Sequence, residues 1–174
     1  RVSRLCSLYA VSGSIGSHVR VDDFCILKGA LEIGSHVHIC AYCSVSGARG
    51  SVTLEDFSTL SNRVSIYTGS DDYRADALSS STVPEEFVVT RTGHVCLRRA
   101  ALVGAHSVIL PGVTLGEACS VGAMCVVHRD VDAGAVMTAA GGRPVMKGQR
   151  DVARILQMAE TVLARDRAAE SQGE

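Results

Sequence analysis

An aliphatic side chain recurs at every sixth position along most of this chain. The residues in register are Ile15, Val21, Leu27, Ile33, Ile39, Val45, Leu54, Leu60, Ile66, Leu97, Val103, Ile109, Leu115, Val121 and Val127. An α-helix repeats near 3.6 residues and a β-strand repeats at two, so neither element alone produces this period. Because an internal repeat takes precedence over local assignments, the period of six decides the fold class.

The residues between these aliphatics predict short strands joined by tight corners. The fifth position of each hexad is small or aliphatic, as in Val19, Cys25, Val37, Cys43, Val64, Ala101, Ser107, Val113, Cys119 and Cys125. The position after the aliphatic is often glycine or acidic, and we expect glycine to supply the positive φ of the corners. Three such strands close a triangular coil of 18 residues, and each coil buries its inner face by stacking on the next, as in a solenoid.

The series is broken in two places and ends before the C-terminus. A shift of three residues occurs around Gly50–Thr53, and residues 67–96 leave the repeat as a loop long enough to be functional. We therefore predict an all-β domain over residues 1–148 that carries this external loop. Residues 149–174 form the second unit, an amphipathic α-helix with a short tail. We expect this helix to cap the open end of the solenoid and cover unpaired strand edges.

Composition excludes several classes of function. The net charge is −1 and aromatic residues make up 4% of the chain, so charge implies no nucleic-acid partner. No apolar run is long enough for membrane insertion, and no segment reads as a signal peptide. The odd number of cysteines, seven, favours reduced thiols and a cytoplasmic location. Cys40 and Cys43 form a C-x-x-C pair, which we interpret as small buried residues of the repeat.

The repeat resembles that of the hexapeptide-repeat acyltransferases. Three segments, VRVDDFCIL (Val19–Leu27), NRVSIY (Asn62–Tyr67) and SVILPGV (Ser107–Val113), are similar to the acetyltransferases of O-antigen amino sugars. Some of those enzymes act on 4-amino-4,6-dideoxyglucose linked to dTDP. The loop and the C-terminal segment resemble the galactoside and maltose acetyltransferase branch.

This resemblance implies a left-handed parallel β-helix, a homotrimer, and acyl-CoA sites between neighbouring subunits. It also implies the reaction: transfer of an acetyl group from acetyl-CoA to an amino or hydroxyl group of a sugar. The sugar is expected to be nucleotide-linked and to serve surface-polysaccharide biosynthesis.

The expected catalytic histidine is missing from the loop. In the galactoside branch a histidine follows a Thr-Gly near the start of the loop, whereas here Thr68-Gly69 is followed by Ser70 and Asp71. We therefore predict that His38 is the general base, because imidazole titrates near neutrality. Asp71 or Asp72 is its expected orienting partner.

The resemblance also implies residues that bind the cosubstrate and the sugar. Small side chains at Ala105 and Ala123 match positions where the extended pantetheine arm lies close to the backbone. The segment GGRPVMK (Gly141–Lys147) is similar to the terminal motif of the family, and cations pair with the phosphates of CoA. The remaining candidates for CoA binding are His128, Arg129, Lys147 and Arg150. The candidates for sugar or nucleotide binding are Tyr42, Tyr73 and Arg74.

Two other classes of protein remain open at this point. A carbonic-anhydrase-like zinc protein needs three histidines, and His36, His38, His94 and His106 are available. Their spacing forms no clear ligand set, so we expect no metal. A non-catalytic β-helix scaffold is favoured by the absence of the loop histidine.

Overall fold

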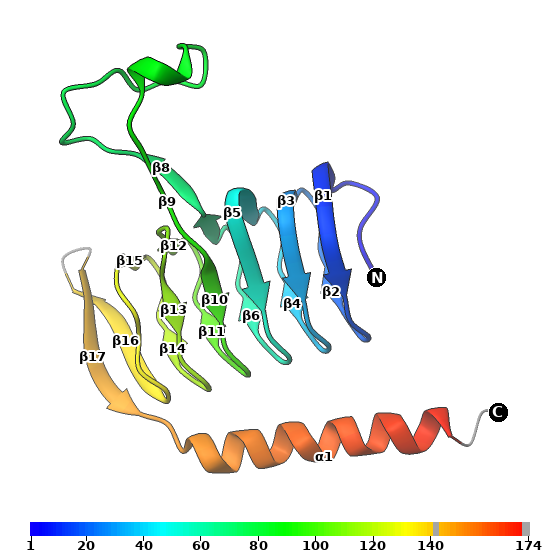
Figure 1. Ribbon diagram of the computed structural model, residues 1–174. Coiled ribbons are helices and arrows are strands. Elements are labelled where there is room, and N and C mark those ends of the chain that lie inside the picture. Colours follow the sequence, from blue (N-terminus) through cyan, green and yellow to red (C-terminus); the bar gives the residue numbers. More distant parts are fainter. Residues whose placement is uncertain (141–142, 172–174) are drawn as a thin grey trace.

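The computed structural model describes residues 1–140 and 143–171, and the strands stack as a three-sided, left-handed parallel β-helix (Figure 1). The first face contains β2 (Arg20–Val21), β4 (His38–Ile39), β6 (Thr59–Leu60), β11 (Leu102–Val103), β14 (Ser120–Val121) and β16 (Ala135–Ala140). The second face contains β7 (Ser65–Tyr67), β12 (Val108–Ile109) and β15 (Val126–Val127), and the third contains β10 (Val95–Leu97) and β13 (Thr114–Leu115). The long strands β1 (Ser7–Ile15), β3 (Ile26–Ile33) and β5 (Ser44–Leu54) bend from the second face onto the third. The predicted fold class is therefore confirmed.

The strand register reproduces the period of the sequence. Leu27 pairs with Val45, and Leu97 pairs with Leu115, so stacked partners lie 18 residues apart. The predicted shift appears between β3 and β5, where Gly29 pairs with Gly47 but Ala30 pairs with Ser51. The three extra residues bulge at one corner and leave the stacking on either side unchanged.

The core consists of the two inward positions of each hexad. Of the fifteen aliphatics in register, all except Ile15 are at most 3% exposed. All ten residues at the fifth positions are buried as well. Ile15 is 52% exposed because it lies on β1, which pairs on one side only, with β3.

The corners are built differently from our expectation, because non-glycine residues hold most of the positive φ angles. One column of such residues, which we call the helix corner, is His18, His36, Phe57, Ala100 and Ala118. A second column, the aromatic corner, is Phe24, Tyr42, Arg63, His106 and Met124. The glycines two residues earlier serve close packing instead: a Cβ at Gly104 would lie 2.5 Å from the backbone nitrogen of Ala123.

The interruption of the repeat projects from the third corner, which we call the loop corner, between β7 and β10 (Figure 1). Its base is an antiparallel pair of β8 (Gly69–Asp71) and β9 (Thr90–Thr92), and a short 3-10 helix, η1 (Glu85–Phe87), lies farther out. The long loop is thus a hairpin whose base is anchored to the coils.

The C-terminal helix does not cap the open end, so this part of the prediction is wrong. After β16, the chain returns as β17 (Arg143–Gln149), antiparallel to β16, and α1 (Val152–Glu170) then runs back along the helix corner (Figure 1). Arg99 of the coils pairs with Glu160 at 2.6 Å. A helix of 19 residues is about 28 Å long, and strands stack about 4.8 Å apart, so α1 reaches across most of the coils. The division of the chain at residue 148 remains a prediction, and residues 172–174 lie outside the described part.

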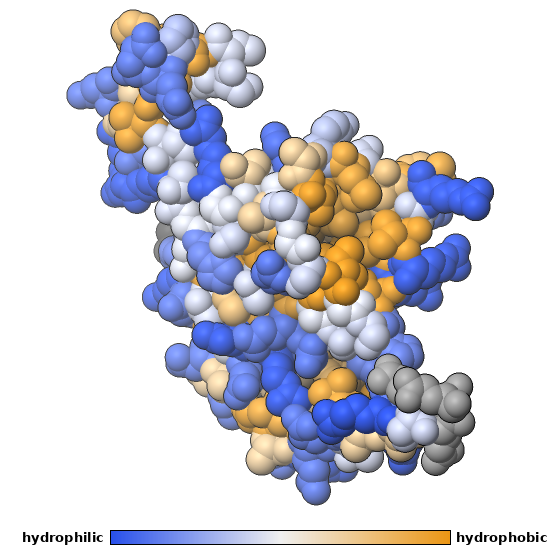
Figure 2. All heavy atoms as spheres, turned by 45° about the vertical axis from the view of Figure 1, so that its right-hand side comes forward, coloured by the Kyte–Doolittle hydropathy of each residue, from blue (hydrophilic) through white to orange (hydrophobic). Residues whose placement is uncertain are grey.

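Apolar side chains gather at the N-terminal end of the solenoid, which Figure 2 brings forward. Those exposed there include Leu5, Leu8, Tyr9, Val11, Ile15 and Ile26. Of these, Leu8 and Ile15 pair in register with the buried Leu27 and Ile33 of β3, so they continue its inward positions. Among the described residues, no helix is long and apolar enough to span a membrane.

Candidate active site

A hollow of about 560 Å³ lies where the loop hairpin leaves the coils. Its lining residues are Arg49, Tyr67, Gly69, Ser70, Asp71, Tyr73, Thr90, Val108 and Leu110. The second face contributes an apolar floor, and β8, β9 and the loop contribute hydroxyl groups and a carboxylate. The guanidinium in the lining is that of Arg49 on β5. An open hollow with an apolar floor and a few convergent polar groups has the character of a small-molecule site.

Asp71 and Asp72 are adjacent in sequence but have different surroundings. Asp71 lines the hollow and accepts a hydrogen bond of 3.3 Å from Thr90 Oγ1. Asp72 is bound to Arg91, whose Nε lies 2.9 Å away, and to the backbone N–H of Arg74 at 3.1 Å. The Arg74 N–H and then Arg91 hold the pKa of Asp72 below its usual value. Asp72 therefore fixes the shape of the loop, and Asp71 is the carboxylate that faces the hollow.

His38 lies on the first face and is paired with a residue that sequence reasoning missed. Its Nε2 is 2.8 Å from Asp22 Oδ2, and Arg20 Nε is 2.7 Å from the other oxygen of the same carboxylate. The hydrogen bonds from His38 and then Arg20 lower the pKa of Asp22. The expected pairing of His38 with Asp71 or Asp72 is thus wrong within one chain, since those residues lie on the loop. The signal for Asp22 was available, because the period of 18 stacks Arg20 on His38 and brings Asp22 close to it.

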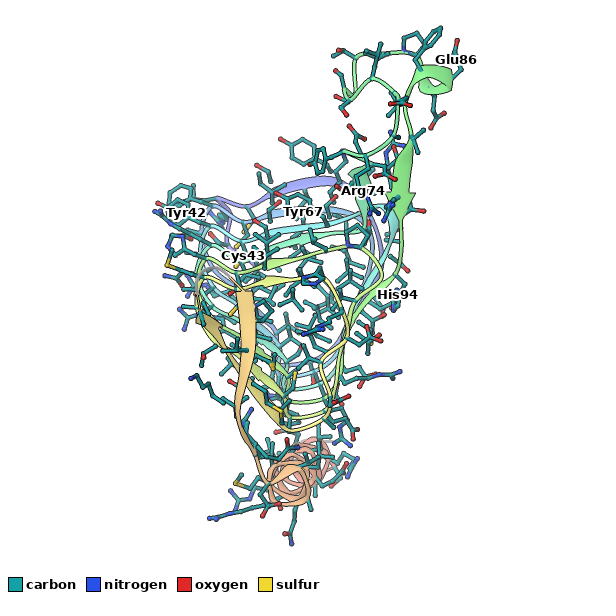
Figure 3. All side chains as sticks on the ribbon, turned by 90° about the vertical axis from the view of Figure 1, so that its left-hand side faces the viewer. Tyr42, Cys43, Tyr67, Arg74, Glu86 and His94 are labelled. Carbon is teal, nitrogen blue, oxygen red and sulfur yellow. The ribbon has the colours of Figure 1, made fainter. Side chains whose placement is uncertain are left out.

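The predicted substrate residues fall into two groups. Tyr73 lines the hollow and is 86% exposed, and Arg74 is its exposed neighbour in the loop. Tyr42 does not line this hollow and stands apart from Arg74, at the aromatic corner (Figure 3). There its ring stacks on Phe24 with centroids 5.0 Å apart, and the guanidinium of Arg63 lies 5.0 Å from the Tyr42 centroid.

The residues that we predicted to bind CoA are also distributed over the coils. Ala105 and Ala123 stack at the aromatic corner, where the N–H of Met124 donates to the carbonyl of Ala105 at 2.9 Å. His128 and Arg129 line a second hollow of about 510 Å³ together with Pro144 and Val145 of β17. The small side chains thus lie at one corner, and His128 and Arg129 lie together near the last coil.

Two of the predicted cations do not join this second hollow. Lys147 is exposed farther along β17. Arg150 lies beyond the end of β17, where its Nη1 donates to the carbonyls of Ala118 at 2.9 Å and Cys119 at 3.4 Å. Arg150 thus holds the start of α1 to the coils, and the predicted pairing of Arg129, Lys147 and Arg150 with CoA phosphates remains a prediction. Of the terminal motif, Gly141 and Gly142 lie outside the described residues.

The four histidines considered for a zinc site are separated. His36 is at the helix corner, His38 on β4 and His106 at the aromatic corner. His94 precedes β10 and its Nδ1 is 2.8 Å from Ser51 Oγ. Within residues 1–140 and 143–171, one chain thus forms no three-histidine set of the carbonic anhydrase kind.

Comparison with known proteins defines the class of this fold and site. No family model matches the chain. A hexapeptide-repeat-containing acetyltransferase from Vibrio cholerae shares the fold, with a TM-score of 0.64 and 19% identity over 79% of this chain and 73% of that one. The architecture is therefore that of the hexapeptide-repeat acyltransferases.

Two more similar proteins define the family. A dTDP-4-amino-4,6-dideoxy-D-glucose acyltransferase from Escherichia coli is 32% identical over 149 residues, covering 83% of this chain and 77% of that protein. AntD, an N-acyltransferase from Bacillus cereus solved in complex with dTDP and 3-hydroxybutyryl-CoA, superposes with a TM-score of 0.86. It is 32% identical, over 95% of this chain and 87% of that one. The chain belongs to the family of sugar N-acyltransferases to which these two proteins belong.

The chain is therefore an enzyme, an acyltransferase that uses acyl-CoA as its cosubstrate and transfers the acyl group to a sugar. This result excludes the non-catalytic scaffold that the missing loop histidine favoured.

Proposed function

We propose that this enzyme N-acylates the 4-amino group of a dTDP-linked 4-amino-4,6-dideoxy sugar. The relatives support this substrate: the Escherichia coli protein is described as acting on dTDP-4-amino-4,6-dideoxy-D-glucose, and AntD has been solved with the same nucleotide sugar and coenzyme A. The single structural observation that carries the proposal is the hollow beneath the loop hairpin, in which Asp71 is the lining carboxylate.

An amine acceptor explains how the reaction proceeds without the loop histidine. The uncharged amine attacks the thioester carbonyl, the C–N bond forms, the C–S bond breaks, and coenzyme A leaves as a thiolate. Nitrogen becomes strongly acidic as the C–N bond forms, so a carboxylate is basic enough to accept its proton. We assign this role to Asp71, to which Thr90 Oγ1 donates a hydrogen bond, and we expect the enzyme to contribute mainly by aligning the two reactants.

We further propose that the active form is a homotrimer and that each site lies between two subunits. Neither His38 nor Tyr42 lines the hollow, and Tyr42 lies away from Arg74 of the loop of the same chain (Figure 3). A neighbouring copy would bring its own His38 and Tyr42 toward the hollow, where His38 would lie beside Asp71 while Asp71 accepts the proton of the amine. The CoA moiety would then follow Ala105 and Ala123 toward His128 and Arg129, with Lys147 near its phosphates.

The biological setting is proposed from the substrate. An N-acylated nucleotide sugar is a donor for glycosyl transfer, which suits surface-polysaccharide biosynthesis. Seven free cysteines and two soluble cosubstrates favour the cytoplasm. The acyl group is proposed to be acetyl, and AntD makes 3-hydroxybutyryl the competing choice.

The test is product formation measured by mass spectrometry. Purified enzyme is incubated with dTDP-4-amino-4,6-dideoxyglucose and either acetyl-CoA or 3-hydroxybutyryl-CoA, and dTDP-glucose serves as the acceptor that has hydroxyl groups only. We expect an amide product from the amino sugar and none from dTDP-glucose. Product from neither acceptor would refute the proposed substrate.

The assignment of Asp71 is tested separately by substitution. Asp71→Asn keeps the size of the side chain and removes the charge, and we expect kcat/KM to fall about 10²–10⁴-fold. Asp76→Asn, at an exposed loop position outside this hollow, is the matched control and should keep the full rate. His38→Ala is measured beside them. Wild-type activity in Asp71→Asn would show that another group accepts the proton.

A further inference from the structure

Two histidines and a carboxylate converge at the helix corner, away from the candidate active site. His18 and His36 occupy the same corner of successive coils, and their rings stack with centroids 4.7 Å apart and planes within 2°. Asp166 of α1 faces both rings with a single oxygen. Its Oδ2 lies 2.5 Å from His36 Nε2 and 3.8 Å from His18 Nδ1.

The surroundings hold two of these three groups, His36 and Asp166, in place. The His36 ring is held between His18 and Phe57, whose ring is stacked on it with centroids 4.7 Å apart. The side chains of His36 and Asp166 are 18% and 24% exposed, so both are largely shielded, whereas that of His18 is 55% exposed. The cluster thus has a fixed inner part and one donor that is free to adjust.

The donor set is one that divalent transition metals prefer. Zinc binds imidazole nitrogen at about 2.0–2.1 Å and carboxylate oxygen at about 2.0–2.2 Å, and two histidines with one carboxylate leave a fourth position for water. Tetrahedral bonds of this length place neighbouring ligand atoms about 3.3 Å apart. The three donor atoms here all lie within 4.8 Å of one another, so His36 and Asp166 must separate slightly while the exposed His18 closes in.

We propose that His18, His36 and Asp166 form a binding site for a divalent first-row transition metal, Zn²⁺ above all, which fastens α1 to the first two coils. The ligands come from positions 18 and 130 residues apart, so the site exists only in the folded chain. A metal that binds the folded state alone stabilises it by linkage. The proposal is independent of acyl transfer, because none of the three residues lines the hollow that contains Asp71.

A second group of possible ligands, Asp22, His38 and Cys40, is less suited to a metal. Arg20 Nε lies 2.7 Å from the Asp22 carboxylate, so a cation there would meet a positive charge. Burial and then the charge of Asp22 raise the pKa of the Cys40 thiol, which opposes formation of the thiolate that a metal requires. This cluster provides the internal control.

The experiment is a Zn²⁺ titration of the chelator-treated full chain, followed by calorimetry and by thermal melting. We expect one saturable site per chain and a melting temperature that rises with metal concentration. Cobalt(II) absorption gives a second readout of nitrogen and oxygen ligation. Amide hydrogen exchange in the last turns of α1 should slow when metal is added.

The His18→Ala variant separates a metal site from a simple ion pair. It leaves the His36–Asp166 hydrogen bond in place and removes one ligand. Loss of an outer-shell partner already costs about 10–100-fold in metal affinity, so loss of a ligand should weaken Zn²⁺ binding at least about tenfold. Asp166→Asn should do the same, and Cys40→Ser should leave the affinity unchanged. Absence of saturable binding, equal affinity in His18→Ala, or loss of binding in Cys40→Ser would each overturn the proposal.

Discussion

Leu97 provides the most direct test of how the stacked coils are held together. It is the first residue of the repeat after the loop, it is 0% exposed, and it pairs in register with Leu54 on one side and Leu115 on the other. Leu97→Ala removes three carbon atoms from this ladder. At about 0.8 kcal/mol for each buried CH₂ group, the loss of transfer free energy is about 2.4 kcal/mol.

The cavity left behind adds to this cost. Measured Leu→Ala substitutions in cores span about 2–5 kcal/mol, and neighbours fixed in a strand ladder cannot collapse far into the space. We therefore expect the free energy of unfolding to fall by about 3 kcal/mol.

The assay is urea unfolding followed by circular dichroism at one fixed protein concentration, because association would make stability concentration-dependent. Met158→Ala, on the exposed side of α1 where Met158 is 54% exposed, is the matched control and should change stability by less than about 1 kcal/mol. A loss in Leu97→Ala no larger than that in Met158→Ala would refute the view that the ladder carries the stability.

Two further predictions concern backbone packing and pH. Gly93→Ala should destabilise the chain by about 1–3 kcal/mol in the same urea assay, because a Cβ there would lie 2.6 Å from the backbone nitrogen of Gly112. Gly148→Ala is its control: a Cβ at Gly148 meets nothing within 4 Å, so stability should be unchanged or slightly raised, and equal effects would contradict this account. The lowered pKa of Asp22 stabilises the folded chain above the unfolded-state pKa of about 3.9, and this contribution disappears as pH falls through the lower folded-state value. Stability curves of wild type and Asp22→Asn should therefore differ near neutral pH and converge once the pH is below the folded-state pKa of Asp22, and a constant difference would disprove the assignment.

The three corners of the coil have distinct roles. The helix corner combines rings at His18, His36 and Phe57 with small side chains at Ala100 and Ala118, and α1 lies along it. The aromatic corner exposes Phe24, Tyr42 and Arg63 as a stacked column. The loop corner supports the hairpin and the hollow beside it. The inner layer repeats from coil to coil, so the features that distinguish this protein are the outward-facing side chains and segments at the three corners.

The sequence by itself determined the inner layer of this protein. Burial of an aliphatic residue every six positions is a property of single residues and their spacing, so it can be read without knowing any distant contact. The shift near Gly50 followed from the same count and is confirmed. The loop was expected over residues 67–96 from that count, and in the structure it leaves the coils between β7 and β10. The candidate residues for CoA binding could also be named from the sequence, and their roles remain predictions.

Only the tertiary structure decided which outward-facing residues meet. His38 pairs with Asp22 and not with Asp71, Arg150 holds carbonyl groups at a corner, and α1 lies along the coils and not over their end. The identity of an outward-facing residue is not restricted by the period of six, because an exposed side chain can adopt many conformations whereas a packed core permits few. Their partners depend on the path of the loop and the tail, and that path is fixed by contacts such as Asp166 with His36, which join residues 130 positions apart.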